Sequence, residues 1–215
     1  MRPRAATRGY PRRVAERYGS NAALIVVDVQ NDFADPAGSL FVKAAGEILP
    51  LVNSEARIAS ESGAFVVYTQ DWHPESTPHF EKDGGVWPVH CVKETWGAEL
   101  HPSLEVVGPN VKKGSNGEDG YSGFSMRDPT TGETVPTDLE RLLRERDIER
   151  VVVVGLATDY CVSATALDAI KLGFRAEVLQ DAIASVDLQP GDGERAKSAM
   201  LAAGCVLGYC FGTLP

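Results

Sequence analysis

The apolar residues of the chain form short runs that alternate with longer stretches of helical periodicity. Short apolar runs are typical of buried strands, and apolar spacings of about three and four are typical of helices packed on a sheet. Weaker strand signals lie near Val111 and Val206. The pattern predicts strands over residues 23–27, 64–70, 149–154 and 176–179, and helices over residues 44–62, 137–146, 160–172 and 193–203.

This alternation of strands and helices is the signature of βαβ units. It predicts an α/β fold with a doubly wound, Rossmann-like, mainly parallel sheet and helices on both faces. Such sheets bind ligands at the carboxyl ends of their strands. Asp28, Asp71, Lys113 and Cys161 each stand at or just after the end of a predicted strand, so we expect them to share one neighbourhood.

The composition indicates a single domain. At 215 residues and 43% hydrophobic content, the chain can bury one sizeable core. Its four cysteines form no CxxC pair, and no apolar segment approaches the roughly 18 residues of a membrane span. We therefore expect a cytoplasmic protein with no membrane partner.

The formal net charge of -9 is unevenly distributed. Residues 1–20 carry six arginines against one glutamate, which leaves +5 on this segment and -14 on the rest of the chain. We predict a basic, disordered extension over residues 1–20 and one domain over residues 21–215; a targeting peptide and an arm for an anionic partner are the alternatives. The acidic body argues against a nucleic-acid partner.

Cys161 opens a predicted helix directly after a predicted strand. The unpaired N–H groups at a helix N-terminus favour a thiolate and can hold an oxyanion. Asp28 has the position of a general base, and the charge of Lys113 is expected to lower the thiol pKa further. Taken singly, each residue has a plainer interpretation: core packing for the thiol, a turn cap for the carboxylate and a surface charge for the lysine.

Three of the four histidines lie between residues 73 and 90, and Asp71 lies two positions before the first. Asp71 and His73 are on one side of an extended segment, and His79 and His90 are on the loop that follows. These nitrogen and oxygen ligands match Zn²⁺, Fe²⁺ or Mn²⁺ with coordination positions left open. The cluster predicts a metal centre, although a lone loop histidine usually only makes hydrogen bonds.

Aromatic residues on the same irregular segments could enclose a planar ring, with core packing as the alternative. The Gly-rich residues 114–123 lack the ending of a phosphate loop, which argues against nucleotide hydrolysis. The aromatic candidates are Phe33, Phe80, Trp87 and Tyr121.

Six short segments occur in a specific order along the chain: ALIVVDVQNDF at 23–33, DWHP at 71–74, WPVHC at 87–91, KG at 113–114, YSGF at 121–124 and GLATDYCV at 155–162. In these segments the chain resembles the nicotinamidases, also called pyrazinamidases, of the isochorismatase-like (cysteine hydrolase) superfamily, over about residues 22–209. The resemblance implies a metal-dependent amidohydrolase of NAD salvage, which converts nicotinamide to nicotinate and ammonia through a thioester.

The resemblance also implies residue roles. Asp28, Lys113 and Cys161 would form the catalytic triad, and a cis peptide bond would join Leu156 to Ala157. The N–H groups of Ala157 and Cys161 would form the oxyanion hole. The implied metal ligands are Asp71, His73, His79 and His90, with Zn²⁺ favoured over Fe²⁺ or Mn²⁺, and the implied ring site is Phe33, Trp87, Tyr121 and Leu156.

Two other functions stay open at this point. One is a related cysteine hydrolase that acts on a different small amide. The other is a non-catalytic member of the fold, either a binding or assembly protein or a redox sensor that uses Cys161; the co-occurrence of triad and metal-ligand residues argues against it. A homo-oligomer is also compatible with the resemblance, because members of this superfamily occur as monomers and as several kinds of oligomer.

Overall fold

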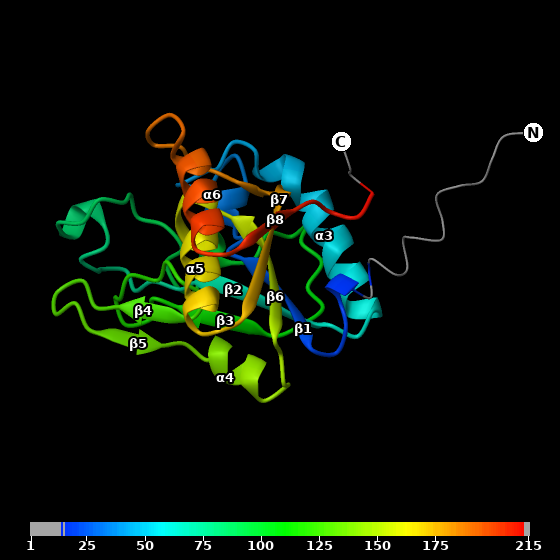
Figure 1. Ribbon diagram of the computed structural model, residues 1–215. Coiled ribbons are helices and arrows are strands. Elements are labelled where there is room, and N and C mark those ends of the chain that lie inside the picture. The colour runs from blue at the N-terminus through cyan, green and yellow to red at the C-terminus, as the bar shows by residue number, and fades with distance from the viewer. Residues whose placement is uncertain (1–13, 15, 213–215) are drawn as a thin grey trace, which may run out of the picture.

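Six parallel strands form the central sheet, in the order β3-β2-β1-β6-β7-β8 (Figure 1). The structure is a computed structural model that describes residue 14 and residues 16–212. All neighbouring strands pair in parallel, which confirms the predicted doubly wound sheet. The strands are β1 (Ala22–Val27), β2 (Phe65–Asp71), β3 (Asn110–Lys113), β6 (Arg150–Leu156), β7 (Arg175–Ala184) and β8 (Val206–Gly208).

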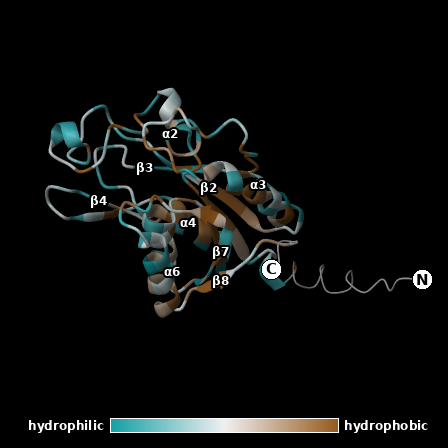
Figure 2. Ribbon diagram, turned by 90° about the horizontal axis from the view of Figure 1, so that it is seen from above, coloured by the Kyte–Doolittle hydropathy of each residue, from teal (hydrophilic) through white to brown (hydrophobic). Residues whose placement is uncertain are grey.

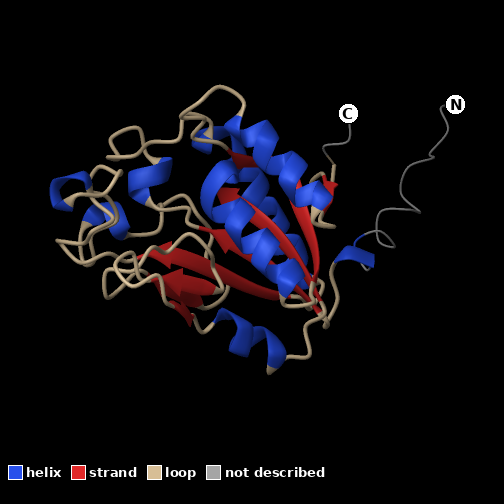
Figure 3. Cartoon of the chain, turned by 60° about the vertical axis from the view of Figure 1, so that its left-hand side comes forward, coloured by secondary structure: helices blue, strands red, loops and turns tan. Residues whose placement is uncertain are grey.

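Helices cover both faces of this sheet, as predicted (Figure 3). One face packs against α3 (Ala45–Glu61), whose buried residues Ile48, Val52 and Ala56 recur every four positions and so form one stripe. The apolar strands run between the two helical layers, and the hydrophilic residues lie outside (Figure 2). The other face packs against α4 (Leu139–Arg144), α5 (Ser163–Lys171) and α6 (Asp192–Ala202).

Several short elements differ from the predictions. An antiparallel hairpin of β4 (Ser125–Arg127) and β5 (Thr134–Pro136) was not predicted, because strands of only three residues are too short to show a period of apolar positions. The helix expected from residue 160 begins as α5 only at Ser163, after a π-type turn, η3 (Thr158–Val162). Loop segments contain α2 (Asn31–Ala34), η1 (Glu81–Asp83) and η2 (Trp96–Ala98).

The last residues of the expected N-terminal extension belong to the domain. Tyr18 is buried, and its hydroxyl donates a 2.7 Å hydrogen bond to the buried carboxylate of Glu55 in α3. Arg17 pairs with Glu177 of β7 at 2.8 Å and lies over the ring of Phe211. The domain therefore starts before residue 21, and the rest of the predicted extension, residues 1–13 and 15, lies outside the described residues.

Gly155 lets β6 pass close to β1 near the carboxyl end of both strands. Its φ is +110°, and an added Cβ would overlap the backbone of Val27. We expect Gly155→Ala to lower the free energy of unfolding by about 2–5 kcal/mol, through positive-φ strain and overpacking. Urea denaturation measures this loss. Gly46→Ala is the matched control, because nothing lies within 4 Å of its Cβ position in α3, and an unchanged midpoint for Gly155→Ala would contradict the prediction.

Candidate active site

Four adjacent strands bring the predicted chemical groups to one edge of the sheet. In the spatial order β3-β2-β1-β6, their carboxyl ends carry Lys113, Asp71, Asp28 and Cys161. Asp71 and Lys113 are register partners. The chain order reverses between β1 and β6, and such a switch point is where open α/β sheets bind ligands. The sequence-based expectation of one neighbourhood is confirmed.

Asp28 is held rigidly at the end of β1. Its φ of +49° turns the backbone out of the strand, and its N–H donates to the Thr69 carbonyl at 3.3 Å. The Thr69 hydroxyl donates to the carboxylate of Asp28 at 2.6 Å. Burial raises the pKa of Asp28 to about 6, although the nearby ammonium of Lys113 acts in the opposite direction. This carboxylate can therefore exchange a proton near neutral pH.

Lys113 is the central cation of the site. Its fully buried ammonium lies 2.7 Å from Asp28 Oδ2 and also contacts Asp71 Oδ1 and the Gly120 carbonyl. Burial lowers the pKa of this lysine, but the two carboxylates outweigh burial and hold it well above its ordinary value. Lys113 is therefore charged at neutral pH, and its Nζ lies 3.7 Å from Cys161 Sγ.

The Cys161 thiol is more buried than its position at the start of a helical segment suggested. Burial raises its pKa well above the ordinary value; Lys113 acts in the opposite direction, whereas Asp28 adds to the rise. This direction is opposite to the sequence-based expectation of a lowered thiol pKa. The resting group is a thiol whose sulfur lies within 4.8 Å of an Asp28 carboxylate oxygen, so a base must remove its proton as it attacks.

Three histidines and one aspartate form a second cluster beside the thiol. Ring nitrogens of His73, His79 and His90 lie within 4.8 Å of one another, and all three side chains are buried. His73 Nε2 lies 3.9 Å from Asp71 Oδ2. Burial lowers the pKa of His73 to about 4 and also lowers that of His90, which leaves both rings neutral and able to bind a cation.

The donor atoms of this cluster fit a divalent metal ion. Both ring nitrogens of His73 are buried and have no hydrogen-bond partner among the described residues, and coordination of a metal ion would satisfy one of them. His90 Nδ1 donates to the Pro88 carbonyl at 2.8 Å, which leaves Nε2 as its ligand atom. Asp28, Asp71 and Cys161 also lie close together, but the ammonium of Lys113 already supplies the positive charge among them.

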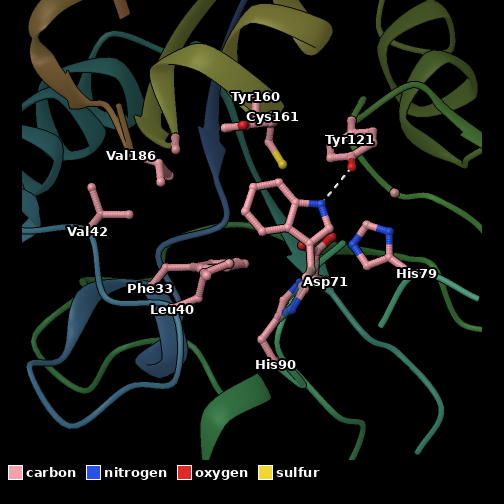
Figure 4. Close-up of a pocket in the computed structure, with 13 residues that line it drawn as sticks. Phe33, Leu40, Val42, Asp71, His79, His90, Tyr121, Tyr160, Cys161 and Val186 are labelled. Atoms are coloured by element: carbon pink, nitrogen blue, oxygen red, sulfur yellow. Dashed lines mark hydrogen bonds between the residues drawn. The ribbon is translucent and has the colours of Figure 1, made fainter. Parts of the chain in front are cut away.

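The two clusters open into one pocket, which is partly open to solvent and whose empty space, including that open part, is about 440 Å³. Figure 4 shows the Cys161 sulfur pointing into it, with His79 and His90 at the other end. The Trp87 indole donates to the Tyr121 hydroxyl at 2.8 Å, which ties two of the aromatic walls together. The lining residues are Phe33, Leu40, Val42, Asp71, His79, Trp87, His90, Gly120, Tyr121, Ala157, Tyr160, Cys161 and Val186.

The cavity wall differs in part from the sequence-based expectation. Leu156, expected to close the pocket, points into the hydrophobic core, and Ala157 lines the cavity instead. The peptide bond between these two residues is cis, as the resemblance implied. Sequence reasoning missed four lining residues: Leu40, Val42, Tyr160 and Val186. Only Tyr160 could have been found from the sequence, because it directly precedes Cys161.

The fold and the site together define a doubly wound α/β protein with a buried thiol, a carboxylate and an ammonium at its switch point. The chain belongs to the isochorismatase family, whose Isochorismatase domain matches residues 22–206. A nicotinamidase from Escherichia coli (strain K12) is 36% identical over 203 residues, which cover 86% of this chain and 93% of the relative.

Two solved structures extend the comparison. A pyrazinamidase of Pyrococcus horikoshii in complex with zinc has a TM-score of 0.78 and 42% identity, covering 88% of this chain and 99% of that one. A protein from L. infantum in complex with nicotinate has a TM-score of 0.81 and 36% identity, and the match covers 90% of this chain and 95% of that one. Among the described residues of the present protein, no helix has the length and apolar character needed to cross a membrane.

Proposed function

We propose that this protein is a nicotinamidase, an amidohydrolase of NAD salvage that converts nicotinamide and water to nicotinate and ammonia. One observation carries the proposal: a single aromatic-walled cavity contains the Cys161 sulfur at one end and candidate metal-binding histidines at the other. A pyridine carboxamide has a carbonyl group that the Cys161 sulfur can attack and a ring nitrogen that can bind the metal held by the histidines. The nicotinamidase and the nicotinate-bound structure among its relatives support the same substrate.

The first half of the reaction transfers the acyl group to sulfur. Asp28 accepts the Cys161 proton as the sulfur forms a bond to the carboxamide carbon. The N–H groups of Ala157 and Cys161 hold the oxyanion, and Lys113 stabilises the negative charge on Asp28 and the sulfur. Asp28 then returns the proton to the departing nitrogen, the C–N bond breaks, and ammonia leaves a thioester on Cys161.

The second half regenerates the thiol. Asp28 accepts a proton from water as the water oxygen bonds to the thioester carbon. The C–S bond breaks, the proton held by Asp28 returns to the sulfur, and the acyl group leaves as nicotinic acid, which loses its proton to solvent and becomes nicotinate. Asp28 therefore carries one proton in each half, for which a pKa near neutrality is suited.

In this proposal Asp71, His73, His79 and His90 hold a divalent ion, and Phe33, Trp87 and Tyr121 hold the ring. Three histidine nitrogens and a carboxylate favour Zn²⁺, with Fe²⁺ and Mn²⁺ as alternatives. When bound, the ion supplies a Lewis-acid contact for the pyridine nitrogen. The zinc-bound pyrazinamidase among the structural neighbours supports this choice.

Ammonia release by the metal-reconstituted protein tests the proposed function. We expect turnover of nicotinamide and of pyrazinamide, both of which have a ring nitrogen. Benzamide is the matched control, because it has the same ring shape and carboxamide without that nitrogen, and we expect it to react far more slowly. Activity on a non-aromatic amide alone would overturn the proposal and favour a different cysteine hydrolase of the family.

The pH profile tests the role of Asp28. Its pKa is raised to about 6 by burial, and only the ionised form can accept the Cys161 proton. We expect kcat/KM for nicotinamide to rise with pH, tenfold per pH unit on the acid side, and to level off above about pH 6 to 7. A rate that is already independent of pH between 4.5 and 6 in the stable, metal-loaded protein would contradict this role.

A further inference from the structure

The loop after β3, residues 114–120, contacts both halves of the site through two consecutive residues. The Gly120 carbonyl accepts a hydrogen bond from the Lys113 ammonium. The carboxylate of Asp119 lies 2.8 Å from His79 Nδ1, one of the two ring nitrogens through which this histidine could bind a cation. The proposed reaction gives Asp119 no role, although its side chain is half-buried.

The contact between Asp119 and His79 engages Nδ1 and so leaves Nε2 as the ring nitrogen available to a cation. An ionised carboxylate only accepts hydrogen bonds, so His79 Nδ1 must carry the hydrogen. The lone pair of the neutral ring is then on Nε2. In metal centres, a carboxylate on the outer nitrogen both orients a histidine ligand and makes it more basic.

Asp119 is itself held in place by the β4–β5 hairpin. Its N–H donates to the Arg127 carbonyl at 2.7 Å, and the Arg127 N–H donates back to the Asp119 carbonyl at 3.0 Å. The Arg127 guanidinium lies 3.7 Å from Asp119 Oδ2, which leaves Oδ1 for His79. The hairpin therefore fixes the direction of the carboxylate.

A second hydrogen bond joins the same two loops. The Thr77 hydroxyl donates to the Gly117 carbonyl at 2.8 Å. Thr77 lies two residues before His79, and Gly117 lies two residues before Asp119 in the loop of residues 114–120. It also accepts the His79 N–H at 3.2 Å. The backbone and the ring of His79 are thus both tied to the loop of residues 114–120.

We propose that Asp119 is a positioning residue of the metal centre, which holds His79 in the tautomer and orientation that present Nε2 to a divalent cation. The inference rests on the proposed function, because it needs the metal centre to exist. It also assigns a task to the β4–β5 hairpin, which supports the centre from outside through Arg127 and Asp119.

Metal affinity of purified variants tests this role. We expect Asp119→Ala to weaken Zn²⁺ binding by about 10- to 100-fold, measured by competition with a chromophoric chelator. Asp119→Asn keeps an acceptor oxygen and should fall between the alanine variant and wild type. Glu118→Gln is the matched control, because it removes the neighbouring carboxylate of the same loop, which hydrogen-bonds to Asn116 rather than to a histidine, and should bind Zn²⁺ like wild type.

A double-mutant cycle separates positioning from general damage to the loop. If Asp119 acts through His79, Asp119→Ala should cost no further Zn²⁺ affinity in a His79→Ala background. The absorption spectrum of the Co²⁺-loaded protein should change in Asp119→Ala and stay unchanged in Glu118→Gln. Equal Zn²⁺ affinity and equal Co²⁺ spectra for wild type and Asp119→Ala would overturn the role of Asp119, whereas a wild type that binds neither ion would overturn the metal centre itself.

Discussion

Cys161→Ala is expected to reduce nicotinamide turnover by about 10⁴-fold or more while the protein keeps its metal. The loss follows because Cys161 provides the one thiol among the described residues that line the cavity, and removal of a catalytic nucleophile typically costs this much or more. The metal should remain because the clustered nitrogens of His73, His79 and His90 do not depend on the sulfur. Ammonia release and metal content of the same preparation measure the two outcomes.

Two further variants make this prediction specific. Cys205→Ala removes another buried thiol and should leave turnover unchanged. Cys205 directly precedes β8, the outermost strand on the side of the sheet away from β3. His73→Ala should show the inverse pattern to Cys161→Ala, with the thiol intact and most of the metal lost. Near-normal steady-state turnover in Cys161→Ala would rule out the thioester route.

The position of the site was predictable because it depends mainly on topology. Apolar runs identify strands, parallel strands share one carboxyl edge, and Asp28, Asp71 and Lys113 end such runs. The hairpin β4–β5 was not predictable in this way, because its strands of three residues are too short for a recognisable apolar run and are held by pairing with each other and with Asp119.

The electrostatics of the site were harder to predict than its position. A position at the start of a helical segment pointed to a thiolate at Cys161, but the pKa also depends on burial, which the surrounding loops create and which acts in the opposite direction. Asp119 had no distinguishing signal either, since it follows the similar residue Glu118 in a loop. Only the fold places one of these carboxylates on His79 and the other on Asn116.

Lys113→Met is expected to lower the free energy of unfolding by about 3–5 kcal/mol at neutral pH. The variant keeps most of the side-chain volume but leaves Asp28 and Asp71 without the ammonium that both contact. Metal-free protein in the presence of a chelator is the proper sample, because a bound cation would partly replace the lost charge. Denaturation by urea at several pH values measures the effect.

The pH dependence identifies the cause of this destabilisation. Lys113 lowers the pKa of both carboxyl groups, so in the variant both pKa values should rise. The stability difference from wild type should be full above those raised values and should shrink as the pH falls and the carboxyl groups become neutral. Lys112→Met is the matched control, because the ammonium of this exposed neighbour lies over the Trp72 ring and makes no ion pair with any described residue.

The same substitution should also alter catalysis in a way that a mere loss of stability would not. Without the ammonium, the acid side of the kcat/KM profile should move to higher pH, because Asp28 then holds its proton more tightly. The maximum rate should fall as well, since no cation remains 3.7 Å from the sulfur to stabilise its negative charge. An acid limb at the wild-type position in folded Lys113→Met would show that Lys113 does not set the protonation of Asp28.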